Sequence, residues 1–257
     1  MRIATWNING LRSRQGLLAL WLAARKPDVV ALQELKLTDA QFPRAELEAL
    51  GYQAVVHGEK GWNGVAILAR KPLDLVQVGL PNQEDFGARF VSARVEGLSV
   101  ASVYCPNGKS ITHADFPRKL AWYDALAAHW AGRHAADEPA LLGGDFNVCP
   151  GALDSWDEAG HAGGIFHTDD ERARFRALLG AGLFDLFRER HPDAQAFTWW
   201  DYRAGAFHKK QGLRIDLLLA TRPVLDRVAA VEIDREYRKK QGGFTASDHA
   251  PVFADLS

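Results

Sequence analysis

The chain has 257 residues, of which 47% are hydrophobic and 25% are charged, and its formal net charge is −1. This balance is typical of a folded protein and excludes a disordered chain or a generally polycationic coat for nucleic acid. No apolar run approaches the roughly 20 residues that a membrane helix needs, and two cysteines cannot form a disulfide framework. The first residues lack the apolar core of a signal peptide, so we expect a cytoplasmic protein.

Short runs rich in β-branched and other apolar residues predict strands throughout the chain. In chain order, the predicted strands span Arg2–Trp6, Val29–Gln33, Ala54–His57, Val65–Ala69, Val91–Val95, Val100–Tyr104, Ala140–Gly143, Ile215–Ala220, Val228–Ile233 and Val252–Leu256. Glu96 and Gly97 lie between two of these runs and are typical of a tight hairpin turn.

Helical periodicity occurs between some of the predicted strands. Gln15–Ala23 and Phe116–Trp130 each place their apolar residues on one stripe. Thr168 and Glu171 have the spacing of a capping box, which predicts that a helix begins there. Because many strands occur with few helices, and no Pro/Gly/Ser-rich linker divides the chain, we expect one α/β domain over residues 1–257 with more than one sheet.

Polar side chains recur at the ends of the predicted strands, where they can leave the core and meet in a cleft. These residues are Asn7, Asn9, Glu34, Tyr104, Asp145, Asn147, Asp216, Asp248 and His249. Asp216 lies in an otherwise apolar run, where a carboxylate is costly to bury unless it is paired or bound to a metal. Oxygen-rich ligands favour Mg²⁺ or Mn²⁺ over Zn²⁺, and a metal with His and Asp can activate water against a phosphodiester.

Several short motifs occur in the order and at the intervals of a known family. They are Thr5–Arg12 (TWNINGLR), Leu32–Lys36 (LQELK), Gly61–Ala66 (GWNGVA), Val103–Gly108 (VYCPNG), Gly144–Asn147 (GDFN), Phe197–Arg203 (FTWWDYR), Leu213–Asp216 (LRID) and Ser247–Pro251 (SDHAP). Through these motifs the chain resembles, over its whole length, the exonuclease III/AP endonuclease branch of the endonuclease–exonuclease–phosphatase superfamily.

The resemblance implies an α/β fold of four layers. Two packed β-sheets, mixed or mainly antiparallel, lie between outer layers of helices in that family. The resemblance also implies a site for Mg²⁺ or Mn²⁺, with Glu34 as the metal ligand and Asn7, Asn9 and Asp248 beside it.

The resemblance further implies roles in catalysis for the remaining polar residues. His249 pairs with Asp216 and contacts the scissile phosphate. Asp145 orients or deprotonates the attacking water or, in other accounts of the family, protonates the leaving group. Asn147 and Tyr104 bind the phosphate.

Double-stranded DNA is the partner that the resemblance implies, at abasic sites, 3′ ends, nicks or gaps, and we expect the chain to act as a monomer. Trp199 is the candidate for the wall of the pocket that receives an abasic or terminal sugar, whereas Trp200 is expected in the core. Other candidate DNA contacts are Arg12, Lys36, Trp62, Lys109, Lys209, Lys210 and Arg214. If several of these cations bind phosphates, affinity for DNA falls steeply with salt.

One stretch, Gly164–Arg172, departs from the family pattern and bears on the size of the sugar pocket. Relatives that cut at abasic sites have a small residue and then Phe shortly before this Arg. An alignment without a gap puts bulky Phe166, followed by His167, at the small position and narrows the pocket. An alignment with one inserted residue restores Phe166 to the Phe of the family.

The sequence therefore predicts a Mg²⁺-dependent DNA repair nuclease that acts as a 3′–5′ exonuclease on duplex DNA, with AP endonuclease and 3′-phosphatase activity. A narrowed pocket instead predicts an exonuclease specialised for 3′ ends, with little AP endonuclease activity. A phosphoesterase for lipids or inositol phosphates is a further alternative, against which Phe197–Arg203 and Leu213–Asp216 argue. A DNA-binding module with a decayed site is disfavoured because every expected polar position is occupied.

Overall fold

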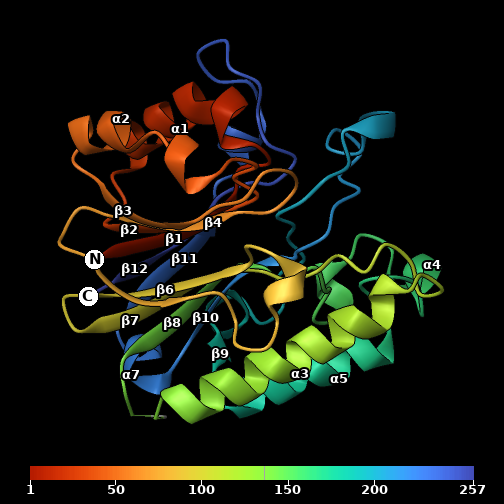
Figure 1. The fold of residues 1–257 in the computed structure, drawn as a ribbon. Coiled ribbons are helices and arrows are strands. Elements are labelled where there is room, and N and C mark those ends of the chain that lie inside the picture. The colour runs from red at the N-terminus through yellow and green to blue at the C-terminus, as the bar shows by residue number, and fades with distance from the viewer. Residues whose placement is uncertain (136) are drawn as a thin grey trace.

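The computed structural model describes residues 1–135 and 137–257, in which two six-stranded mixed β-sheets pack face to face (Figure 1). The first sheet has the order β11 (Val228–Ile233), β12 (Val252–Leu256), β1 (Arg2–Asn7), β2 (Val29–Gln33), β4 (Val65–Ala69) and β3 (Gln53–His57). The second has the order β5 (Asp74–Val78), β6 (Phe90–Val95), β7 (Leu98–Tyr104), β8 (Ala140–Asp145), β10 (Asp216–Ala220) and β9 (Phe184–Asp185).

Helices cover the outer face of each sheet, which confirms the predicted four-layer α/β sandwich (Figure 1). Helices α1 (Leu11–Arg25) and α2 (Arg44–Ala49) cover the first sheet, and α3 (Asp115–Arg133) and α5 (Asp169–Gly180) cover the second. The shorter helices are α4 (Glu158–His161), α6 (Leu186–Arg190) and α7 (Arg222–Leu225). Among the described residues, no helix combines the length and the apolar composition needed to cross a bilayer.

Apolar side chains form three layers that hold the sandwich together. Leu141 and Val252 belong to the layer between the sheets, Trp21 to the layer beneath α1, and Trp122 and Phe175 to the layer beneath α3 and α5. Since each fully buried large side chain contributes about 1.5–3 kcal/mol, these layers fix the sheets on which the polar strand ends are carried.

All of the predicted strands and helices are present, with ends that differ by a few residues. The capping box is confirmed: Thr168 Oγ1 accepts a hydrogen bond from Glu171 N at 3.1 Å, and Thr168 N donates to Glu171 Oε2 at 3.1 Å. Glu96 and Gly97 form the predicted hairpin turn, with φ angles of 47° and 83°. Strands β5 and β9 were not predicted, because β5 is an edge strand exposed on both faces and β9 has only two residues.

A buried polar network joins the two sheets directly behind the strand ends. Gln33 Nε2 donates hydrogen bonds to Thr5 Oγ1 at 3.1 Å and to Ser102 Oγ at 3.0 Å, and Ser102 Oγ donates to Leu32 O at 3.0 Å. Because these bonds join β1 and β2 of the first sheet to β7 of the second, they fix the position of one sheet relative to the other next to Glu34.

Candidate active site

The register of the strands brings the predicted polar residues to one end of the sandwich. In the first sheet, Asn7 at the end of β1 lies opposite Gln33 at the end of parallel β2. In the second sheet, Tyr104 at the end of β7 lies opposite Asp145 at the end of parallel β8. Asp145 also lies opposite Asp216, the first residue of antiparallel β10. Both sheets therefore present polar side chains at the same end.

The backbone turns sharply where several of these strands end. Asn9, Glu34 and Asn147 have φ angles of 48°, 50° and 49°, in the left-handed region. This conformation costs an L residue roughly 1–2 kcal/mol, less for Asn, and such strain is common at functional sites. Gly144 permits close approach within β8, because a Cβ there would lie 2.0 Å from Val103 O.

Ionisable groups gather at this end into what we call the acidic cluster. Its members are Glu34, Lys36, Asp145, Asp216, Asp248 and His249. Ligand atoms of Glu34, Asp145 and His249 all lie within 4.8 Å of one another. Asn7 Nδ2 donates a hydrogen bond to Glu34 Oε1 and another to Asp145 Oδ2, each at 2.9 Å, so one amide fixes the spacing of two carboxylates.

His249 is buried and is held by Asp216. Its Nδ1 lies 2.8 Å from Asp216 Oδ2, and its Nε2 lies 3.9 Å from Asp145 Oδ2. Burial lowers the pKa of His249, but Asp216, Asp248 and the hydrogen bond to Asp216 outweigh it and raise the pKa to about 10. The ring is therefore an imidazolium at neutral pH, and its Nε2–H is available as a donor.

Asp145 has an environment that favours its neutral form. Burial raises the pKa of Asp145 to about 7; His249 acts against this shift, and Asp216 and Glu34 add to it. Asn147 N also donates to Asp145 Oδ1 at 3.0 Å. A carboxyl that titrates near neutral pH can both accept and release a proton, as general acid–base catalysis requires.

Asp248 and Lys36 complete the cluster on the side of the first sheet. Asp248 accepts hydrogen bonds from Asn9 Nδ2 at 2.7 Å and from Trp199 Nε1 at 3.0 Å. Burial raises the pKa of Asp248, but His249 and these two bonds lower it below its ordinary value. Lys36 Nζ lies 3.0 Å from Glu34 Oε2 and 2.6 Å from Asn9 Oδ1, so this lysine, predicted to contact DNA, lies within the cluster.

The donor set of the cluster fits a hard divalent cation. Four carboxylates converge there against the imidazolium of His249 and the half-buried ammonium of Lys36. Carboxylate and amide oxygens are the ligands that Mg²⁺ and Mn²⁺ prefer, and an uncompensated group of buried carboxylates is costly without a cation. A bound cation would supply the missing positive charge.

Asn147 and Tyr104 lie beside the cluster, as predicted. Asn147 Nδ2 donates to Cys105 O at 2.9 Å, and Asn147 Oδ1 accepts from Asn107 Nδ2 at 3.3 Å. Burial first, and then the negative charges of Glu34 and Asp145, raise the pKa of Tyr104 well above its ordinary value. The Tyr104 hydroxyl is therefore protonated and can donate a hydrogen bond.

Apart from half-buried Lys36 and Trp199, the candidate DNA contacts fall into two groups in the structure. The exposed ones are Arg12, Trp62, Lys109, Lys209 and Lys210. Arg214 is buried, with a side chain only 1% exposed, and the prediction that it contacts DNA is wrong. Its Nε lies 2.6 Å from Asp154 Oδ1 and its Nη2 lies 2.7 Å from Asp185 Oδ2, so a DNA phosphate cannot reach it.

The residues proposed to shape the sugar pocket lie together. Half-buried Trp199 and Phe166 pack against one small apolar group of Cys149, Leu213 and Ile215. His167, next along the chain, is buried, and its Nε2 lies 3.0 Å from Ser155 Oγ. Trp200 is 1% exposed, which confirms its predicted place in the core.

Two hydroxyl residues that support the cluster were not predicted. Thr198 Oγ1 accepts hydrogen bonds from the backbone N of Ile215 at 3.1 Å and of Asp216 at 3.0 Å. Ser247 Oγ donates to Asn7 O at 2.7 Å and accepts from His249 N at 3.2 Å. Their signal was their place inside the motifs Phe197–Arg203 and Ser247–Pro251, beside residues that carry charge.

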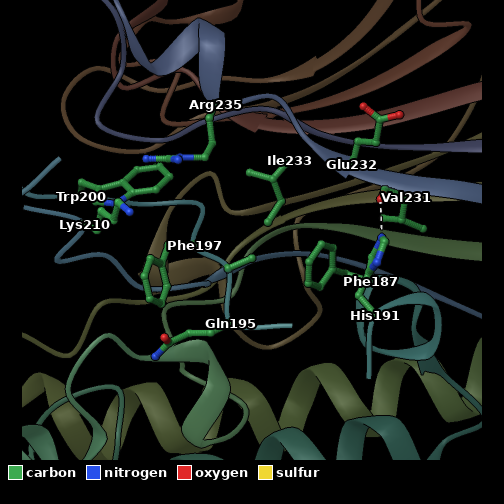
Figure 2. A pocket seen from close by; sticks show the side chains of 11 residues that line it. Phe187, His191, Gln195, Phe197, Trp200, Lys210, Val231, Glu232, Ile233 and Arg235 are labelled. Atoms are coloured by element: carbon green, nitrogen blue, oxygen red, sulfur yellow. Dashed lines mark hydrogen bonds between the residues drawn. The ribbon is translucent and has the colours of Figure 1, made fainter. Parts of the chain in front are cut away.

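A cavity of about 480 Å³ lies elsewhere in the molecule, between β11 and the segment 191–200 (Figure 2). Phe197, Trp200 and Ile233 give it apolar walls, and His191 and Arg235 add polar groups. The described residues that line this cavity include no member of the acidic cluster. This cavity is therefore separate from the acidic cluster.

Comparison with known proteins agrees with the geometry. The sequence profile of the Endonuclease/Exonuclease/phosphatase family matches residues 4–249. Exodeoxyribonuclease III of Haemophilus influenzae is 35% identical over 272 residues, covering 100% of both chains. The 3′ phosphatase NExo from Neisseria, solved with a product DNA hairpin, is 37% identical with a TM-score of 0.95, covering 100% of this chain and 99% of that one.

An AP endonuclease from Archaeoglobus fulgidus has the same TM-score of 0.95 at 31% identity, again covering 100% of this chain and 99% of the other. These TM-scores show that both solved structures share the fold of this chain. The chain therefore belongs to the endonuclease/exonuclease/phosphatase family, and within it to the nucleases of the exodeoxyribonuclease III and AP endonuclease type.

Proposed function

We propose that this chain is a single nuclease domain that acts as a monomer and uses Mg²⁺ to hydrolyse phosphodiesters at 3′ ends of duplex DNA. The observation that carries the proposal is the convergence of Glu34, Asp145 and His249 within 4.8 Å. All cluster groups come from one chain, which suits a monomer. The name of the Haemophilus influenzae relative, and the DNA hairpin in the Neisseria structure, support a duplex DNA substrate.

Glu34 and Asp248 are the proposed carboxylate ligands of the metal. Asn7 and Asn9 hold these carboxylates through hydrogen bonds of 2.9 and 2.7 Å, which limits their movement. A bound Mg²⁺, or Mn²⁺ in its place, would offset the negative charge that builds on the phosphate and would favour ionisation of water.

Asp145 is the proposed base that accepts the proton of the attacking water. We assign this role to Asp145 and not to His249, because, against the effect of burial, Asp216 and Asp248 raise the pKa of His249 to about 10 and so favour its imidazolium form. The water oxygen forms the new bond to phosphorus, and its proton passes to Asp145. The bond from phosphorus to the leaving 3′ oxygen breaks, and that oxygen takes a proton from solvent to become the 3′ hydroxyl. A positioned base typically contributes 10²–10⁴-fold.

His249, Tyr104 and Asn147 are the proposed donors to the phosphate oxygens. Asp216 fixes the His249 ring through Nδ1, so Nε2–H is the group that faces the cluster. The Tyr104 hydroxyl keeps its proton because its pKa is raised well above the usual range by burial and by Glu34 and Asp145. Donors fixed before reaction stabilise developing negative charge more than mobile water does.

Processing of 3′ ends is proposed to dominate over incision at internal abasic sites. Phe166 packs with Trp199 on one apolar group, and His167 is buried beside it, so two bulky rings occupy the stretch where a small residue is expected. A wall built in this way leaves less room for an extruded sugar. The Neisseria relative at 37% identity is named a 3′ phosphatase, which supports the same preference.

Product analysis on defined duplexes, with Mg²⁺ or with EDTA, tests both the metal-dependent hydrolysis of DNA and the preference for 3′ ends. We expect release of nucleotides and phosphate from 3′ ends at blunt ends, nicks and gaps, only with the metal, and weak cleavage of an internal abasic site. Phe166→Gly should raise abasic-site cleavage. Its φ of 72° favours glycine, so the substitution relieves backbone strain and should leave folding intact.

The possible outcomes test the narrowed pocket, the metal and the substrate separately. Robust cleavage of the internal abasic site by the unsubstituted protein would overturn the narrowed pocket and leave the nuclease chemistry intact. DNA hydrolysis that persists in EDTA would overturn the metal. Release of phosphate from a soluble inositol phosphate, without cleavage of DNA, would overturn the substrate.

A further inference from the structure

Lys119 is a fully buried cation in the described part of the chain, on the inner side of α3. Its Nζ donates hydrogen bonds to Asn147 O at 2.7 Å, to Asn107 O at 3.1 Å and to Glu171 Oε1. These three acceptors satisfy all three ammonium hydrogens. The lysine is therefore committed to contacts inside the protein and takes no part in binding solvent or DNA.

Glu171 carries the connection from Lys119 to the sugar-pocket segment. Its Oε1 accepts a hydrogen bond from Phe166 N at 3.1 Å, and its Oε2 accepts from Thr168 N at 3.1 Å and Thr168 Oγ1 at 2.7 Å. The Lys119 ammonium also lies 4.8 Å from the centre of the Phe166 ring. The ion pair therefore holds the backbone and the ring of Phe166.

Asn147, whose backbone oxygen accepts a hydrogen bond from Lys119, has a strained backbone conformation that needs support from its neighbours. Its φ of 49° is left-handed, and its carbonyl points to Lys119 while its side chain is fixed by Cys105 O at 2.9 Å. Lys119 Cδ also fills the space beside Gly108, where a Cβ would approach it to 3.0 Å. Three chain segments far apart in sequence thus meet at one ammonium group.

We infer that Lys119 and Glu171 form a positioning pair that sets Asn147 against the scissile phosphate and ties it to the segment of Phe166. This inference rests on the phosphate contact proposed for Asn147. Neither residue touches the substrate, so both act through the backbone they hold. A displacement of about 1 Å at a group that contacts the reacting atoms can cost 10²-fold in rate.

Steady-state kinetics of Lys119→Met on a nicked duplex, alone and combined with Asn147→Ala, tests the inference. Met matches the apolar stem of Lys and removes the charge. We expect kcat to fall by about tenfold in Lys119→Met, with KM within about twofold of the unsubstituted protein. Because Lys119 acts through Asn147, the double variant should lose no more than Asn147→Ala alone.

Two further variants show whether a lower kcat reflects a loss of folding and not a loss of positioning. Lys119→Met leaves the Glu171 carboxylate buried without its partner, so Lys119→Met with Glu171→Gln, in which both residues are neutral, is measured beside it. Arg25→Met is the matched control. It leaves the buried carboxylate of Asp234 without its guanidinium partner, at the end of α1 on the other sheet, so it should lower Tm without changing kcat.

The outcomes are distinct. A full loss in Asn147→Ala, a smaller loss in Lys119→Met and no further loss in the double variant support the inference. Losses that multiply in the double variant, or an unchanged kcat in both the Lys119→Met and the neutral-pair variants, overturn it while leaving the proposed function intact. An unchanged kcat in Asn147→Ala overturns the role proposed for Asn147 and the inference together.

Discussion

Two groups of buried charge lie close together in this molecule and differ in how completely their charge is balanced. In the first, which we call the arginine network, Arg214 binds Asp154 and Asp185, and Arg188 Nη2 lies 2.6 Å from Asp154 Oδ1. Two carboxylates thus meet two guanidinium groups. The acidic cluster instead brings four carboxylates to one imidazolium and a half-buried lysine.

Both groups contain close ion pairs, but in the acidic cluster the close contact of His249 Nδ1 with Asp216, at 2.8 Å, uses only one of the two ring nitrogens. Arg214 lies 2.6 and 2.7 Å from its two carboxylates, the spacing of charge-assisted hydrogen bonds. His249 Nε2 lies 3.9 Å from Asp145 and 4.0 Å from Asp248, too far for hydrogen bonds. A balanced and closed group of charges holds the fold, whereas an unbalanced group with a free donor is suited to bind a cation and a phosphate.

Substitutions in the acidic cluster should have the largest effects, and on turnover. Asp145→Asn removes the proposed base, and His249→Ala removes the imidazolium donor. Each should lower the kcat of the folded protein by at least about 10²-fold on a 3′-end substrate, because Asp145 is the proposed base and His249 is the proposed donor to the phosphate. Rates are measured with Mg²⁺ in excess, and circular dichroism and Tm serve as controls. Near-normal turnover in both purified variants would contradict the assigned site.

Arg214→Met should show the opposite pattern, with a large effect on stability. The substitution leaves Asp154 and Asp185 buried without their shared partner, which typically costs about 3–5 kcal/mol in the free energy of unfolding. Urea denaturation measures this loss. Binding of duplex DNA by the folded fraction should keep the same dependence on salt, and a flatter dependence would restore the original interpretation of Arg214 as a phosphate contact.

Arg214 also shows where sequence reasoning fails. A sequence pattern shows that an arginine lies beside a motif, but the partners that bury it, Asp154 and Asp185, are distant in the chain and have no recognisable spacing. Lys119 was missed for a related reason, since a lysine on a helix is usually solvated. The burial of both side chains depends on tertiary contacts, which the sequence pattern does not show.

Asp216 was predicted to lie in the site for a physical reason that acts locally. A carboxylate within an apolar strand must have a partner, and that requirement is visible in the sequence. Strand periodicity likewise predicted the apolar runs, and the family motifs predicted how they stack. Edge strand β5 was not predicted because Leu75 and Val78 are 54% and 45% exposed, so no buried face imposes an alternating pattern on its residues.

The pH dependence of the free energy of unfolding also tests the charge imbalance of the acidic cluster, with a smaller expected effect. The pKa of Asp145 is raised to about 7 in the folded chain, mainly by burial, against an ordinary value near 4 when unfolded. The folded state therefore binds more protons between these values, and its stability falls as pH rises from about 4 to about 7. Asp145→Asn has no carboxyl group at this position, so its stability does not fall in this way.

Urea denaturation in EDTA at pH 5 and pH 8 measures the effect. The gain in the free energy of unfolding of Asp145→Asn over the unsubstituted chain should be larger at pH 8, by on the order of 2 kcal/mol. Ordinary titration of histidines in the unfolded chain contributes equally to both proteins and cancels. An equal gain at the two pH values would contradict the imbalance of charge proposed for the acidic cluster.

The exposed lysines should give the smallest effect, and one that distinguishes them from Arg214. Lys209 lies in an exposed loop a few residues beyond the motif Phe197–Arg203, whereas Lys71 lies beyond β4, at the end of the first sheet opposite to the acidic cluster. If Lys209 neutralises one phosphate, Lys209→Ala should flatten the plot of log binding constant against log salt by about 0.9. Lys71→Ala, the matched control, should leave that slope unchanged. Binding titrations with Asp145→Asn, which limits cleavage of the DNA, give both slopes, and equal slopes would remove Lys209 from the DNA-binding surface.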